Sequence, residues 1–182
     1  IQAQIIQIKM HLPASKSPRL LRLPSWIPGS YMIRDFAQHL HREVAFTTKQ
    51  QRVVLTKKTK NTWLLAPCED ACIVSYAVFA NDLSIRSAFI NDQYAFMNGT
   101  CIFLQVLDAD EQGSVLNETG IQDAQPYHVQ IMQNAYLQQK KWKISTSMKE
   151  VKHRPLDSGL LMGEYHSADY AELIDHPFVI GQ

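Results

Sequence analysis

The sequence lacks a long apolar run and an excess of charge. No apolar stretch among its 182 residues approaches the ~20 residues that a membrane-spanning helix needs. The formal net charge is +1, from 18 basic and 17 acidic residues. Such a balance provides no electrostatic attraction to nucleic acid or to an anionic membrane. We therefore expect neither nucleic acid nor a membrane as a partner.

Cysteine is also scarce. Cys68, Cys72 and Cys101 are odd in number and contain no CxxC pair, so a disulfide scaffold is not expected. We predict that all three are reduced, and that Cys72 and Cys101 are small core residues inside apolar strands. Reduced thiols favour a reducing compartment, and the cytoplasm is the expected location. The chain opens at Ile1 without an initiator Met, so it carries no information about a removed signal.

Complete catalytic sets are absent as well. The sequence has no His-Glu-x-x-His element, which places two zinc-binding imidazoles and a carboxylate base on one helix. It has no Gly-x-Ser-x-Gly nucleophile elbow, and its seven glycines are scattered rather than grouped in a phosphate loop. We therefore expect no catalytic residue, metal site or cofactor site within this chain.

The dominant pattern that is present has a period of two. The length suits one domain, and 46% of the residues are hydrophobic. Short β-branched and aromatic runs recur about every ten residues with turn signals between them. They predict strands at residues 2–12, 20–23, 43–47, 52–56, 62–65, 71–80, 101–107, 127–132 and 142–146.

Helical signal is sparse, and residues 167–174 are the best candidate for a helix. Ser167 can cap such a helix, Asp169 lies near its positive end, and Pro177 ends it. We therefore predict a mainly β fold: an antiparallel β-sandwich or a saddle-shaped sheet, with one short C-terminal helix. The sequence does not say which strands pair.

Residues 23–36 form the most informative stretch, Leu-Pro-Ser-Trp-Ile-Pro-Gly-Ser-Tyr-Met-Ile-Arg-Asp-Phe. Its prolines and glycine exclude a helix. Trp26 and Tyr31 offer apolar faces with polar tips, and Arg34 and Asp35 bring a charge pair into the same turn. A rigid surface loop of this composition is typical of a contact site.

This stretch and three others together resemble the N-terminal region of the glycyl-aminopeptidase family of zinc metallopeptidases, peptidase family M61. The first segment, Leu23–Ala37, is specific. The others are Asn81-Asp-Leu-Ser-Ile-Arg86, Asn98-Gly-Thr100, and Tyr170 with Glu172-Leu-Ile-Asp-His-Pro177. They occur in the family's order, and the resemblance covers about residues 5–181.

The resemblance implies that residues 1–182 are one non-catalytic N-terminal β domain of a larger aminopeptidase-like enzyme. The family's catalytic domain, with its zinc ligands and general base, would follow residue 182, and a PDZ domain often follows that. The β domain would pack on the catalytic domain and wall the peptide cleft. Trp26, Tyr31, Arg34 and Asp35 would contact that domain or the substrate, with Arg34 paired to Asp35 or to a carboxylate across the boundary.

Separation from the catalytic domain would expose the interdomain face of this chain. Exposed apolar patches drive self-association, so dimers or larger assemblies are expected. Two other functions remain compatible with the sequence. One is a free-standing β-sandwich module that binds peptide or carbohydrate. The other is an independent hydrolase that uses Cys or His residues.

Overall fold

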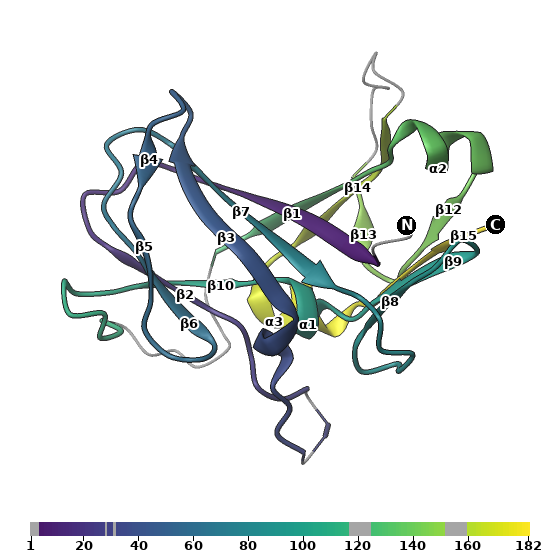
Figure 1. Cartoon of the computed structure of the whole chain (residues 1–182), viewed down its shortest axis with the longest axis horizontal. Helices are drawn as coiled ribbons and strands as arrows, with labels where there is room; N and C mark the ends of the chain where they lie inside the picture. The colour runs from purple at the N-terminus through teal and green to yellow at the C-terminus, as the bar shows by residue number, and fades with distance from the viewer. Residues whose placement is uncertain (1–3, 28, 31, 117–124, 152–159) are drawn as a thin grey trace.

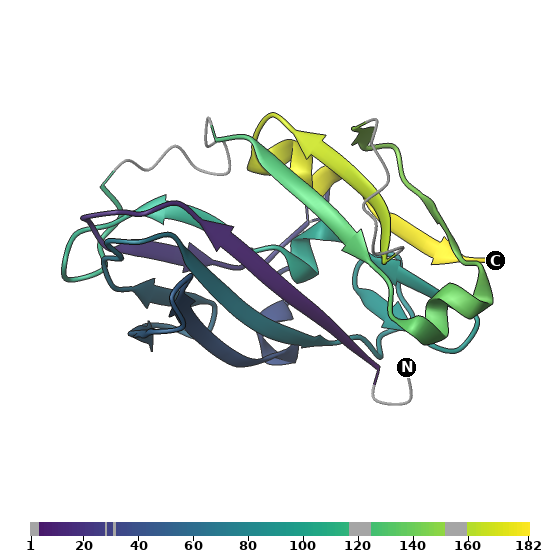
Figure 2. The same ribbon diagram turned by 90° about the horizontal axis from the view of Figure 1, so that it is seen from above.

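The structure is a computed structural model that describes residues 4–27, 29–30, 32–116, 125–151 and 160–182. Its strands form four antiparallel sheets that are arranged in two pairs, one at each side of Figure 1. The two pairs remain side by side in the perpendicular view of Figure 2. The mainly β prediction is thus confirmed.

The first pair of sheets comes mainly from the N-terminal half of the chain. One sheet has the order β1 (Ile5–Leu12), β7 (Cys72–Phe79), β3 (Leu40–Thr47), β4 (Arg52–Val53). The other has the order β10 (Gln105–Asp108), β2 (Arg19–Arg22), β6 (Thr62–Leu65), β5 (Leu55–Lys57). Buried positions alternate with half-buried ones along β6 and the first half of β7, which places one face of each strand on the core.

The second pair comes mainly from the C-terminal half. A three-stranded sheet has the order β11 (Tyr127–Met132), β14 (Leu161–Ser167), β13 (Lys149–Glu150). A four-stranded sheet has the order β12 (Lys143–Ser145), β15 (Phe178–Gly181), β9 (Tyr94–Met97), β8 (Ala88–Ile90). One continuous hydrophobic core, reaching from Leu12 to Ile180, links both pairs.

The helices are short: η1 (Phe36–His39), α1 (Gly99–Ile102), α2 (Ala135–Lys140) and α3 (Tyr170–Asp175). Within the described part of the chain, none of them has the length and apolarity to cross a bilayer. The expected C-terminal helix is present as α3. Asp169 rather than Ser167 caps it, since the Asp169 carboxylate accepts a hydrogen bond from the Glu172 N–H at 2.8 Å.

Helix α1 joins the two halves of the molecule. The Tyr76 hydroxyl of β7 donates to the Ile102 carbonyl at 2.7 Å, and the Tyr170 hydroxyl of α3 donates to the Phe103 carbonyl at 2.7 Å. A Cβ on Gly99 would lie 2.8 Å from the Ile174 Cα, so only glycine permits this approach of α1 to α3.

The strand predicted at residues 101–107 is partly wrong. Residues 99–102 are helical because the Asn98 carboxamide caps them, and only residues 105–108 form a strand. Cys101 is accordingly buried in a helix, whereas Cys72 is buried in a strand, as expected. Only one helix was predicted, whereas the structure also has η1, α1 and α2. Five strands were not predicted: β8, β9, β13, β14 and β15.

Candidate functional site

Loop 24–35, which follows β2, projects from the lower edge of the molecule in Figure 1. Its base is fixed by Asn61 of the β5–β6 turn, whose side-chain N–H donates to the Leu23 carbonyl at 2.8 Å and to the Ser25 hydroxyl at 3.2 Å. Ile27 packs against the core. Gly29 has a φ of +79°, a conformation that favours glycine. The loop thus has a defined base despite its lack of regular structure.

Arg34 and Asp35 have separate partners. The Arg34 guanidinium donates to the Ser30 hydroxyl at 2.9 Å and to the Met32 carbonyl at 3.3 Å, both within the loop. The Asp35 carboxylate lies 3.2 Å from the Lys60 ammonium. Of the two pairings expected for Arg34, the described residues do not form the one with Asp35: Arg34 bonds within the loop, and Asp35 connects the end of the loop to the β5–β6 turn. The other, with a carboxylate across the domain boundary, stays a prediction. The Asp35–Lys60 pair is exposed and adds little stability.

Trp26 is 42% exposed and is not part of the hydrophobic core, so a large share of its surface is open to a partner. Tyr31, the other aromatic residue expected at this site, lies outside the described residues. Met32 and Ile33, which sequence reasoning did not single out, are more exposed still, at 62% and 79%. Their apolar character between Ser30 and Arg34 was the only signal that could have found them.

A second exposed loop, residues 81–86, lies between β7 and β8 and projects from the same edge in Figure 1. Leu83 is 71% exposed and Ile85 is 75% exposed. Eleven large hydrophobic side chains are exposed in the described ranges, and five of them lie in loops 24–35 and 81–86. Such a concentration is typical of an interaction surface rather than of scattered surface residues.

Both loops are attached to α1. The Cys101 thiol donates to the Arg86 carbonyl at 3.2 Å, the Asn98 carboxamide donates to the Ile85 carbonyl at 3.4 Å, and η1, which follows loop 24–35, packs on α1. Burial raises the pKa of the Cys101 thiol to about 12. This thiol is therefore a protonated structural group and not a nucleophile. The four segments that carry the family resemblance therefore lie around α1: residues 98–100 begin this helix, η1 and α3 pack on it, and loop 81–86 is hydrogen-bonded to it.

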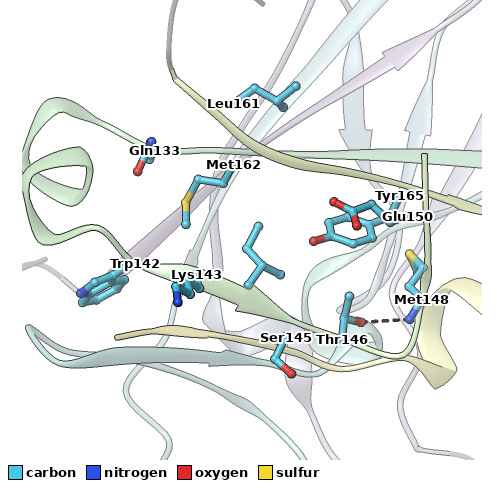
Figure 3. A pocket seen from close by; sticks show the side chains of 11 residues that line it. Gln133, Trp142, Lys143, Ser145, Thr146, Met148, Glu150, Leu161, Met162 and Tyr165 are labelled. Atoms are coloured by element: carbon cyan, nitrogen blue, oxygen red, sulfur yellow. Dashed lines mark hydrogen bonds between the residues drawn. The ribbon is translucent and has the colours of Figure 1, made fainter. Parts of the chain in front are cut away.

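A separate pocket of about 560 Å³ lies between β12, β13 and β14, as Figure 3 shows. Trp142 and Tyr165 line it, but both are almost fully buried, and the Trp142 Nε1 has no hydrogen-bond partner. Burial, and then the nearby Glu150 charge, raise the pKa of Tyr165. The lining contains Ser145 and Thr146 but no histidine that could activate either hydroxyl.

The residues that the structure describes do not fit a metal centre, because they contain no group of three or more His, Cys, Asp or Glu side chains that could hold an ion. His166 forms a cross-strand ring pair with His128, with centroids 4.9 Å apart, and His176 hydrogen-bonds to the Ser147 hydroxyl at 2.7 Å. No reaction step of a metallopeptidase can therefore be assigned to these residues.

The comparisons with known proteins identify the family of this chain. Residues 1–182 match the family model described as the peptidase M61 N-terminal domain. A crystal structure of an aminopeptidase N family protein from Idiomarina loihiensis is similar, with 28% identity and a TM-score of 0.81; the match covers 99% of this chain and 27% of that chain. No curated protein matches. The chain belongs to the peptidase M61 N-terminal domain family.

Proposed function

We propose that this chain is the non-catalytic N-terminal domain of a zinc-dependent aminopeptidase-like metallopeptidase, and that it packs on the catalytic domain and walls the substrate cleft. The zinc ligands and the general base would belong to the polypeptide beyond this chain. Support comes from the family and from the similar aminopeptidase structure, of which this chain spans about a quarter.

One observation carries the placement of the wall: loops 24–35 and 81–86 expose Trp26, Met32, Ile33, Leu83 and Ile85 on one edge. These side chains do not serve this chain's own core, so a partner surface is needed to bury them. A wall at this edge would limit the length of peptide that enters the cleft and would exclude water from the reacting groups.

Trp26→Ala and Arg34→Ala in the full-length enzyme test this role. Trp26 is 42% exposed and lies outside the hydrophobic core, and Arg34 bonds only within its loop, so each change should lower the unfolding temperature only slightly. Each should lower kcat/KM for peptide hydrolysis about tenfold, equivalent to ~1.4 kcal/mol of transition-state stabilisation. Val54→Ala, at a site that is 66% exposed on the distant β4–β5 connection, is the control. Unchanged kinetics with a lowered unfolding temperature would leave these loops only a folding role.

The pocket beside β12 and β14 supports the alternative of a free-standing peptide-binding module, since its volume lies in the range of small-ligand sites. Its aromatic residues are buried, which disfavours the exposed stacking surface that a sugar requires. Saturable binding of short peptides to the wild-type chain, lost in Glu150→Gln, would favour this alternative over the proposed function.

A further inference from the structure

The outer face of the four-stranded sheet β12-β15-β9-β8 carries several bulky apolar side chains. When one face of an antiparallel sheet packs on the core, the other face is commonly polar. In β9 the opposite holds: Ala95 and Met97 are buried in the core, whereas Tyr94 and Phe96 are half-buried on the other face. The bulky aromatic groups of this strand thus point away from the core.

These aromatic groups belong to an apolar row that we define as Val179, Phe96, Phe89 and Tyr94. Val179 is directly opposite Phe96 across β15 and β9, and Phe96 is directly opposite Phe89 across β9 and β8. The Tyr94 ring lies 5.5 Å from that of Phe89. Val179 is 44% exposed, and none of the four belongs to the hydrophobic core.

The C-terminal strand of the chain, β15, belongs to this same sheet. β15 ends at Gly181, which pairs with Tyr94, and Figure 1 shows the C-terminus beside β9 and β12. A hollow of about 770 Å³ is bounded by Gln182 itself together with Tyr94, Val179 and Lys143. Any residue that follows Gln182 therefore begins next to the apolar row.

We propose that the polypeptide downstream of Gln182 packs against the apolar row, so that this sheet face is a second interdomain contact besides loops 24–35 and 81–86. The proposal rests on the proposed function, because it requires this chain to be the N-terminal part of a longer peptidase. A tethered segment meets the row at a high effective concentration, whereas a second copy must diffuse to it. Asp92, Lys140 and Lys143 around the hollow provide a polar rim for such a contact.

Photo-crosslinking in the full-length polypeptide tests the contact. Val179→p-benzoylphenylalanine should give intrachain crosslinks to residues beyond 182, identified by mass spectrometry. The same substitution at Val54, which is 66% exposed in the other half of the molecule, should give none. Crosslinks from position 179 only to a second copy, or no crosslink at all, would overturn the proposal.

A charge at the same position provides an independent readout. Val179→Asp places a carboxylate in the contact and should accelerate proteolytic cleavage of the junction after Gln182 about tenfold, whereas Val54→Asp should not. An unchanged cleavage rate would contradict the contact. Peptidase activity is measured on the same samples: inactivity of the wild-type enzyme would overturn the proposed function, while the crosslinks report on the packing alone.

Discussion

Among single residues, Asn98 has the most consequential contacts of the site. Its carboxamide oxygen accepts hydrogen bonds from the Thr100 N–H at 3.1 Å and the Thr100 hydroxyl at 2.6 Å, and its N–H donates to the Ile85 carbonyl. One side chain thus caps α1 and attaches loop 81–86 to it. Loss of this side chain should affect both the helix and the exposed loop.

Asn98→Ala should lower the free energy of unfolding by about 1–2 kcal/mol, the usual cost of losing a helix cap. Urea denaturation of the two proteins measures this difference. Asn134→Ala, which removes the cap of the peripheral α2, is the matched control. Asn134→Ala should lower stability by a similar amount but leave the proposed peptidase activity unchanged. An equal loss of activity in Asn98→Ala and Asn134→Ala would contradict the role of loop 81–86.

The cysteines give a prediction about pH. Burial raises the pKa of Cys72 and of Cys101 to about 12 each, above the ordinary value of 9.0. The folded state therefore favours the protonated thiols, and their contribution to stability is complete below about pH 9 and declines as the pH rises toward 12. At pH 8 neither thiol should react with a thiol-specific reagent until urea unfolds the chain. Rapid labelling of Cys101 in the folded protein would contradict this burial.

Residue types alone were sufficient to locate loop 24–35 and to predict buried Cys72 and Cys101. Composition could not reveal that Met32, Ile33, Leu83 and Ile85 are exposed, because exposure depends on which strands surround a loop. The partner of Asp35 was also beyond prediction, since Lys60 is distant in sequence and reaches it only through the β5–β6 turn.

At the scale of elements, a strand was predicted correctly where its alternating pattern did not compete with a helix cap or an interrupting glycine. β6 and β11 have the predicted bounds because their alternation is flanked by polar turns. The apolar run at 101–107 concealed a helical turn, because the Asn98 cap outweighs the strand preference of the residues that follow. β14 was missed because Gly163 interrupts it, although this glycine leaves room for the Tyr165 side chain that lies over it.

The α1–α3 contact gives the prediction at this scale. Gly99→Ala should destabilise the protein by about 3 kcal/mol, the upper end for overpacking, because the added Cβ meets the Ile174 Cα and the Leu173 carbonyl, which are backbone atoms. Gly29→Ala should cost only about 1 kcal/mol, from its positive φ alone. The denaturant midpoints of both variants measure these losses of stability. Equal losses of stability in the two variants would mean that α1 and α3 can move apart freely.

At the scale of the whole molecule, the two pairs of sheets share one core, so we expect them to unfold together. The sequence motifs were sufficient to predict the family and the mainly β class. The four-sheet arrangement was not predictable, because strands such as β9 and β15 pair across 80 residues of intervening sequence, and short-range patterns carry no information about such pairs.

Exposed apolar surface should make the isolated chain self-associate. Loops 24–35 and 81–86 and the apolar row together leave six large hydrophobic side chains exposed by a third or more, and water disfavours them. Sedimentation velocity at increasing concentration should show a growing fraction of dimers or larger species, which the combined changes Ile33→Ser and Val179→Ser reduce. A single monomeric species at high concentration would show that these surfaces do not self-associate.

Zinc content and dipeptide hydrolysis, measured on the purified 1–182 chain and on the full-length polypeptide in parallel, test the central claim most directly. The account predicts about one zinc per molecule and measurable cleavage for the full-length protein, and neither for residues 1–182 alone. Stoichiometric zinc together with dipeptide cleavage by residues 1–182 alone would contradict it.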